Sequence, residues 1–276
     1  MQVINHRLCQ DDGTPVTFRP SPNCGGAVKH EYLVMHYTAG PSLDQAVKWL
    51  VSASSKASAH IVIGRDGKIV QLVPFDTVAW HAGVSSWQGL SKLNNYALGI
   101  ELDNAGPLVR SGNQWVAWFG DIYSNDQVIE ATHKNESSVR GWHLYSPQQL
   151  YLALEIAALL VHHYHLKDVL GHEDISPGRK TDPGPAFPME TFRSRVFGRA
   201  DSDKEDNGAY CTTTNLHIRT GPGGQYPTLA VSPLPTGIRL QVLAAQGEWK
   251  QVVTLEAVKG VASVRGWVNG RYLQLV

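Results

Sequence analysis

The chain has 276 residues, enough for one large or two modest domains, and 42% of them are hydrophobic, which is sufficient for a buried core. Its 24 Lys and Arg residues balance its 24 Asp and Glu residues, so no net charge attracts nucleic acid or an anionic membrane. The longest purely apolar run, residues 156–161, is too short to span a bilayer. We therefore expect a soluble protein that binds neither nucleic acid nor membrane.

The N-terminal residues MQVINHRLCQDDG lack the apolar stretch of a secretory signal. We expect a cytoplasmic protein, or one that is exported by a route which this sequence does not encode. The cysteines are Cys9, Cys24 and Cys211, and their odd number gives no disulfide framework, although a bridge between Cys9 and Cys24 stays open.

Apolar runs and helical stripes alternate through the first two hundred residues, which predicts an α/β domain. Two helices carry S-x-x-Q capping boxes at their starts, formed by Ser42 with Gln45 and by Ser146 with Gln149. The elements expected in chain order are a strand at 31–38, a helix at 42–54, a hairpin at 59–73 with its turn at 64–67, a strand at 96–104 and a helix at 146–166.

Three further segments differ in character from this pattern. The residues between Asp103 and Ser146 are rich in Gly, Asn and Trp, and we interpret them as a long irregular segment that is functional or disordered. Residues 198–208 are polar and charged, which is typical of a linker. Residues 209–276 alternate short apolar and polar runs broken by Gly and Pro, which predicts a small all-β module built as a barrel.

The stretch VLGHEDISPGRKTDPGPAFP, residues 169–188, concentrates ionisable groups where no helical or strand period survives. His172 and Asp182 within it are plausible zinc ligands, and His36 lies at the end of an apolar strand. Two neutral imidazoles and one carboxylate would leave an open position for water, as a catalytic zinc requires. A surface loop with solvated charges explains the stretch equally well, because spacing alone does not show that these residues meet.

Other polar residues leave similar alternatives open. Glu101 alternates with Ile100 and Leu102, so its carboxylate lies on a solvated strand face or acts as a positioned acid/base. His60 and His81 line a cleft or simply pack in the interior. The cluster formed by His162, His163 and His165 is interpreted as solvated and favourable to the dipole at its helix end.

Five motifs in this order resemble the zinc-dependent N-acetylmuramoyl-L-alanine amidases of type 2, which are related to peptidoglycan recognition proteins. They are VMHYTAG, SAHIVIGRDGKIVQLV, WHAGVSSW, NNYALGIELDN and GHEDISPGRKTDPGPAFP, and the resemblance spans residues 31–192. Residues 209–276 resemble a bacterial SH3-like domain in their rhythm of strands, turn glycines and tryptophans. The resemblance implies a mixed central β-sheet flanked by helices at 1–197, a linker at 198–208 and an SH3-like wall-binding barrel at 209–276.

The resemblance also implies roles for particular residues. It implies that Glu101 is the catalytic acid/base, that Lys180 assists at the scissile carbonyl, and that Zn²⁺ is the cofactor. The implied zinc ligands are His36, His172 and Asp182, and the implied substrate contacts are Tyr37, His60, His81 and Asn95.

The expected reaction is hydrolysis of the amide between the lactyl group of N-acetylmuramic acid and L-alanine of the bacterial stem peptide. The alternatives are a cytosolic recycling amidase acting on soluble (anhydro)muropeptides, and a peptidoglycan-binding protein without activity. The complete zinc set favours an enzyme, and the added SH3-like module favours the polymeric cell wall as substrate. Oligomeric state and stem-peptide preference are not predicted by the sequence.

Overall fold

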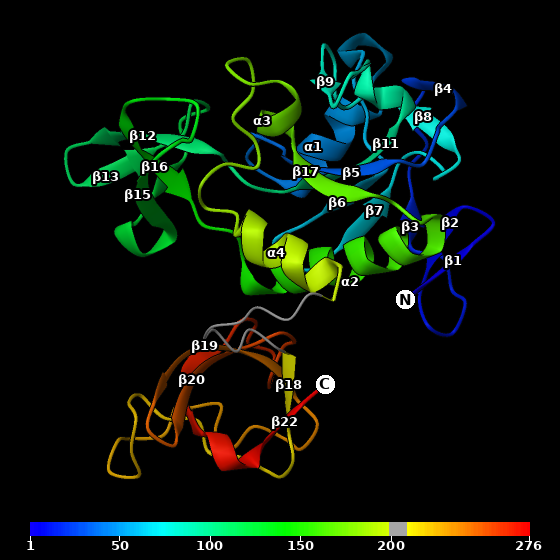
Figure 1. Cartoon of the computed structure of the whole chain (residues 1–276). Coiled ribbons are helices and arrows are strands. Elements are labelled where there is room, and N and C mark those ends of the chain that lie inside the picture. The colour runs from blue at the N-terminus through cyan, green and yellow to red at the C-terminus, as the bar shows by residue number, and fades with distance from the viewer. Residues whose placement is uncertain (199–208) are drawn as a thin grey trace. The chain divides into compact units, whose positions relative to one another are not determined.

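The structure, a computed structural model, describes residues 1–198 and 209–276 (Figure 1). The chain divides into two units, Met1–Ala200 and Asp201–Val276. The predicted linker at 198–208 lies, apart from Gly198, outside the described residues. Among the residues that the structure describes, none of the helices combines the length and apolar character that a membrane span requires.

A six-stranded mixed sheet in the order β17-β5-β11-β6-β7-β3 is the centre of the first unit. β5 runs parallel to β11 and β17, and β6 runs parallel to β11 but antiparallel to β7. The predicted strands at 31–38 and 96–104 and the hairpin at 59–73 are therefore confirmed. The strands are β3 (Thr17–Phe18), β5 (Tyr32–Tyr37), β6 (Ile61–Ile63), β7 (Ile69–Gln71), β11 (Ala97–Leu102) and β17 (Asp168–Gly171).

Side-chain alternation gives this sheet two different faces. Met35 and Ile100 point to the face covered by α2 (Pro147–Tyr164), where they join its buried aliphatic side chains. Because neighbouring residues of a strand point to opposite faces, His36 and Glu101 lie on the face away from α2. α1 (Leu43–Leu50) packs against Val62 of β6 in a separate apolar cluster. The sheet therefore separates its main core from the side that carries polar groups.

Both predicted helices begin at the predicted residues. The Ser146 hydroxyl accepts a hydrogen bond from the Gln149 backbone N–H at 3.1 Å, and Gln149 Oε1 accepts one from the Ser146 backbone N–H at 3.3 Å, which completes the capping box. Ser42 accepts from the Gln45 N–H at 3.3 Å, which is one half of the predicted box.

The remaining elements of the first unit are short and lie around the sheet. α3 (His172–Ile175) directly follows β17, and α4 (Met189–Val196) packs against α2. The others are β1 (Gln2–Ile4), β2 (Arg7–Cys9), β4 (Cys24–Ala27), β8 (Thr77–Ala79), β9 (Ser86–Trp87), β10 (Leu90–Ser91), and the 3₁₀ turns η1 (Ala53–Ser55) and η2 (Leu93–Asn95). Cys9, Cys24 and Cys211 are free thiols. The disulfide between Cys9 and Cys24 that the sequence left possible is therefore not formed.

The segment between Asp103 and Ser146 is not irregular, and that prediction was wrong. It forms a five-stranded antiparallel sheet in the order β14-β13-β12-β16-β15. Trp115 packs directly on Gly141, where an added Cβ would lie 2.5 Å from the indole ring. Its strands are only two to five residues long, too short for a clear alternation in the sequence. They are β12 (Pro107–Ser111), β13 (Gln114–Val116), β14 (Ile122–Tyr123), β15 (Val128–Thr132) and β16 (Val139–His143), with η3 (Asn125–Gln127) before β15.

The second unit is an antiparallel sheet in the order β21-β20-β19-β18-β22, which confirms the all-β prediction. Its two end strands, β21 and β22, do not pair with each other within the described residues, so a closed barrel is not shown. A cluster of aliphatic side chains that includes Ile218, Leu240 and Val252 forms its own core. The elements are β18 (Ala209–Thr212), β19 (Arg239–Gln246), β20 (Trp249–Thr254), β21 (Arg265–Asn269), η4 (Gly270–Tyr272) and β22 (Leu273–Leu275).

His60 allows a test of the buried hydrogen bonds in the first unit. It is 0% exposed, its Nδ1 accepts from the Gly99 N–H at 3.0 Å, and its Nε2 lies 2.9 Å from the Thr77 carbonyl oxygen. Desolvation lowers the pKa of His60 to about 4, although the bond to Thr77 favours its charged form. We predict a neutral ring at pH 5.5, measured by long-range ¹H–¹⁵N NMR.

The same shift predicts the direction of acid destabilisation. An unfolded histidine has a pKa of about 6.5. Below that pH, His60 binds a proton in the unfolded chain but not in the folded protein. The contribution of His60 to the free energy of unfolding is therefore complete above pH 6.5 and falls as the pH drops toward 4. Half-protonation of His60 at pH 6 or above would contradict this account.

Candidate metal centre

Three parallel strands end at the same edge of the main sheet, which is where polar side chains of an α/β sheet converge. His36 of β5 is the register partner of Glu101 of β11, so both side chains project to one face. Gly171 of β17 pairs with Met35, and His172 follows immediately as the first residue of α3. The register alone therefore brings His36, Glu101 and His172 into one neighbourhood.

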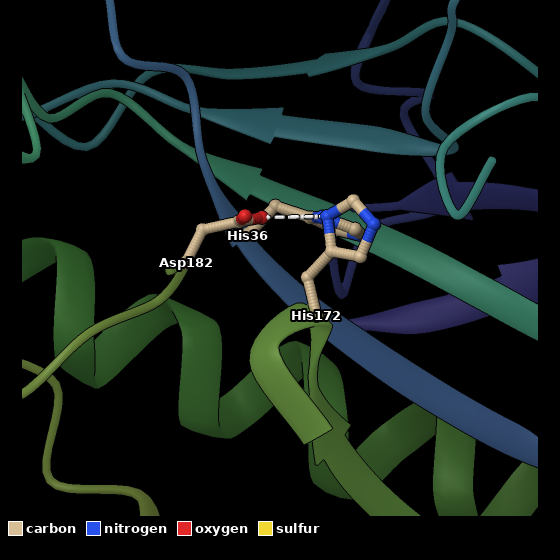
Figure 2. A group of neighbouring side chains, drawn as sticks. All are labelled: His36, His172 and Asp182. Carbon is tan, nitrogen blue, oxygen red and sulfur yellow. Dashed lines mark hydrogen bonds and ion pairs between the residues drawn. The ribbon is translucent and has the colours of Figure 1, made fainter. Parts of the chain in front are cut away.

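The predicted ligands meet in the folded chain. His36 Nδ1 lies 3.0 Å from His172 Nδ1 and 2.8 Å from Asp182 Oδ2, and His172 Nδ1 lies 2.9 Å from the same oxygen. Figure 2 shows the His172 ring and the Asp182 carboxylate converging on His36. The three residues are 1%, 3% and 5% exposed, respectively. Within residues 1–198 and 209–276, this is the one group of His, Cys, Asp or Glu side chains whose ligand atoms are close enough to share a metal.

The hydrogen-bond pattern around these atoms suits a bound cation. His172 Nε2 lies 3.0 Å from the carbonyl oxygen of Ala82, which can only accept, so Nε2 carries the hydrogen and Nδ1 of the neutral ring is bare. Burial disfavours the charge on Asp182, but its contacts to His172 and His36 outweigh burial and hold its pKa below the ordinary range. Two imidazole nitrogens and a carboxylate oxygen therefore converge in a buried site, where a shared proton or a bound cation compensates the carboxylate charge.

The donor set fits a divalent transition metal. Imidazole and carboxylate ligands bind such ions with bonds of about 2.0–2.2 Å, so tetrahedral ligand atoms lie about 3.3 Å apart. The three separations, 2.8, 2.9 and 3.0 Å, are slightly shorter. Among the described residues, no fourth His, Cys, Asp or Glu side chain belongs to the group.

Hydrogen bonds from two sides hold the loop that delivers Asp182. The Glu173 N–H donates to the Asp182 carbonyl at 2.9 Å, and the hydroxyl of Tyr145 donates to the carbonyl of Pro183 at 2.7 Å. The Gly184 N–H donates to Glu173 Oε2 at 3.1 Å, at a backbone φ of +73° that glycine adopts without strain. The irregular backbone of this stretch is therefore fixed by specific contacts.

Glu101 has the environment of a proton-transfer group. Its Oε2 atom is buried and has no hydrogen-bond partner among the described residues. Burial and then the charge of Asp182 raise the pKa of Glu101 well above its ordinary range, and the ammonium group of Lys180 partly opposes them. Lys180 is half-buried. Burial lowers the pKa of His36 to about 4, and the charge of Lys180 makes a smaller contribution in the same direction. A carboxyl group with a raised pKa and a free oxygen is suited to take up and return a proton.

The four candidate substrate contacts lie in different environments. Tyr37 is half-buried, and its hydroxyl lies 2.6 Å from Thr181 Oγ1. His60 is fully buried with both ring nitrogens bonded to backbone, so it offers no surface to a ligand. His81 is 8% exposed and contacts His36, while Asn95 is exposed at the end of η2. Of the four, the structure brings His81 directly to a predicted metal ligand.

No motif in the sequence indicated the buried contact between His133 and Glu173 beside the centre. His133 Nε2 lies 2.6 Å from Glu173 Oε2, and Lys134 Nζ lies 2.9 Å from Glu173 Oε1. His133 and Lys134 belong to the segment that was interpreted as irregular, and Glu173 had been counted with the charges of the stretch at 169–188. These contacts attach the five-stranded sheet segment to the residue next to His172.

Comparison with known proteins identifies the family of this chain. Residues 26–185 match the N-acetylmuramoyl-L-alanine amidase family, and the chain belongs to that family.

Two curated relatives from Escherichia coli (strain K12) illustrate the similarity. The N-acetylmuramoyl-L-alanine amidase AmiD is 32% identical over 175 residues, which cover 60% of this chain and 53% of AmiD. The 1,6-anhydro-N-acetylmuramyl-L-alanine amidase AmpD is 38% identical over 144 residues, which cover 52% of this chain and 61% of AmpD. The chain thus spans between half and two thirds of the length of these relatives. A crystal structure of a selenomethionine AmpD derivative covers 71% of this chain and 99% of its own, at 27% identity and a TM-score of 0.49.

Removing the Glu173 carboxylate tests whether its contact with His133 supports the metal centre. In Glu173→Ala, the buried His133 Nε2 and the Gly184 N–H lose their partner. Because a buried polar group that is left without a hydrogen-bond partner costs about 1–3 kcal/mol, we expect at least a loss of this size in the free energy of unfolding, measured with urea. The exposed Glu190 gives a matched control, and Glu190→Ala should change that free energy by less than about 0.5 kcal/mol. Equal effects of the two variants would contradict a supporting role for the pair.

Proposed function

We propose that the chain hydrolyses the amide bond between the lactyl group of N-acetylmuramic acid and L-alanine of a peptidoglycan stem peptide. The observation that carries this proposal is the convergence of two imidazole nitrogens and a carboxylate oxygen beside the unpartnered carboxyl of Glu101. Membership of the amidase family and the names of AmiD and AmpD support the same reaction. The family match covers residues 26–185, so the proposal for the whole chain extends beyond the matched part.

The metal in this proposal is zinc, held by His36, His172 and Asp182. Two imidazoles and one carboxylate with an open position are the ligand set of hydrolytic zinc sites. When bound, zinc supplies a Lewis acid and lowers the pKa of a bound water from about 15.7 to about 7.

Glu101 and Lys180 carry out the remaining steps. Glu101 takes the proton of the attacking water and later returns it to the leaving amine of L-alanine, and its raised pKa suits both transfers. Lys180 stabilises the negative charge that develops on the amide oxygen, an electrostatic contribution of the kind worth about 3 kcal/mol. Tyr37 and Asn95 remain candidate substrate contacts.

The second unit favours the polymeric wall as the substrate. We propose that residues 209–276 are an SH3-like wall-binding domain, joined by residues 198–208 to a catalytic domain at 1–197. A second binding module raises the effective concentration of a polymer at the active site, but gives little advantage with a small soluble substrate. The second candidate is a recycling amidase for soluble anhydromuropeptides, and the similarity to the 1,6-anhydro-N-acetylmuramyl-L-alanine amidase AmpD favours it.

Glu101→Gln tests the acid/base role. The substitution keeps the volume and removes the charge, so the fold and the metal content should remain. We expect kcat to fall by about 10²–10⁴-fold with a small change in KM, because the carboxylate acts mainly in the transition state. Metal content must be measured on the same sample. A fully metal-loaded variant whose kcat falls by less than about threefold would rule out this role, since general acid/base catalysis contributes far more.

A truncation after Ala200 tests the wall-binding role. Met1–Ala200 is a compact unit, so it should fold, bind metal and cleave soluble muropeptides at the rate of the full chain. Its cosedimentation with purified sacculi should be lost, and its turnover of sacculi should fall. Unchanged cosedimentation would show that residues 209–276 are not a wall anchor.

A further inference from the structure

We propose that His81 is a positioning residue that fixes the tautomer and orientation of His36 as a metal ligand. The inference rests on the proposed metal centre, but it concerns a residue that binds neither metal nor substrate. It replaces the expectation that His81 contacts the substrate.

The hydrogen bonds around His81 can run in only one direction. His81 Nε2 lies 3.1 Å from the carbonyl oxygen of Ala97, which can only accept, so this nitrogen carries the hydrogen. In the neutral ring, His81 Nδ1 is then a bare acceptor, and it lies 3.0 Å from His36 Nε2. His36 must therefore carry its hydrogen on Nε2. Its bare Nδ1 is the atom that faces His172 and Asp182.

The bond also fixes the direction of the His36 ring. The rings of His36 and His81 meet edge to face at an interplanar angle of 81°, with centroids 5.1 Å apart. Both ring nitrogens of His81 are engaged inside the protein, so its polar atoms are not available to a substrate. A partner of this kind holds a ligating histidine in position and raises its basicity, and its loss costs about 10–100-fold in metal affinity.

Gly99 explains how the chain makes room for this bond. A Cβ atom on Gly99 would lie 2.6 Å from Cγ of His81, so the imidazole packs directly against the β11 backbone. This backbone cannot move away easily, because the N–H and the carbonyl of Gly99 both bond to His60 at 3.0 Å. An added methyl group must therefore displace His81. Glycine is required here by close approach and not by backbone conformation.

Asn94 holds the main chain of His81 from the other side. Its Oδ1 accepts the N–H of His81 at 3.0 Å and the N–H of Ala82 at 2.7 Å. Ala82 in turn offers its carbonyl to His172 Nε2. The motif WHAG therefore supports both ligating histidines, through the side chain of His81 and the main chain of Ala82.

The test measures zinc affinity by competition with a chromophoric chelator, using purified full-length protein stripped of metal. His81→Leu removes the acceptor, and Gly99→Ala displaces it without changing His81. We expect both variants to bind zinc about 10–100-fold more weakly than the unchanged protein. His81→Asn keeps an oxygen acceptor near the position of Nδ1, and we expect it to retain most of the affinity. We therefore expect His81→Asn to bind zinc more tightly than both His81→Leu and Gly99→Ala. A purely structural role of His81 would not produce this order of zinc affinities.

His30→Leu is the matched control. His30 Nε2 also bonds to a backbone carbonyl, that of Phe75, but His30 does not contact His36. Its zinc affinity should equal that of the unchanged protein. A second readout is the hydrogen exchange of His36 Nε2–H in the zinc-loaded protein, which should be slow with His81 and fast in His81→Leu.

The outcomes separate this inference from the proposed function. Unchanged affinity and slow exchange in both His81→Leu and Gly99→Ala would overturn the inference and leave the metal centre intact. If the unchanged protein itself takes up no zinc, the metal centre is wrong and the inference fails with it. If His81→Leu does not fold, Gly99→Ala and His81→Asn still decide, because the first must lose affinity and the second must keep it.

Discussion

The convergence of three polar side chains in one buried site is the constraint on which the rest of the structure depends. Two imidazole nitrogens and a carboxylate oxygen lie 2.8–3.0 Å apart, and hydrogen bonds on their far sides prevent the rings from turning away. A shared proton or a bound cation compensates the carboxylate charge that is buried there. The backbone of residues 169–188 is irregular because it must place His172 and Asp182 on either side of one point.

The sheet register provides the rigid part of the site, and loops provide the rest. Parallel pairing of β5 with β11 places His36 beside Glu101, and a shift of one residue would move either side chain to the face covered by α2. The loops are then held by contacts that carry no chemistry themselves, such as the pair between His133 and Glu173. This division agrees with the general need to fix catalytic groups through surrounding side chains.

The sequence predicted the elements whose physics is local. The strand at 31–38 and the capping box of Ser146 depend on residues within one or two turns, and both were confirmed. The resemblance supplied the proposed ligands, but that His36 and His172 meet across 136 positions is a property of the folded sheet.

Three features could not be predicted from the sequence for the same reason. In each case, contacts between distant residues determine the structure that a polar or glycine-rich segment adopts. The strands between Asp103 and Ser146 are too short to show a period, so they were interpreted as irregular. For His60 the sequence left a cleft position and interior packing open, and its two backbone bonds become visible only when Gly99 and Thr77 are placed around it. The partner of Glu173 lies 40 positions away in a different sheet.

The most direct test of the account is anomalous diffraction at the zinc absorption edge, from crystals of the protein purified without added metal. The account predicts one peak, about 2.0–2.2 Å from His36 Nδ1, His172 Nδ1 and a carboxylate oxygen of Asp182. A peak at any other group of residues, or coordination through the Nε2 atom of either histidine, would contradict it.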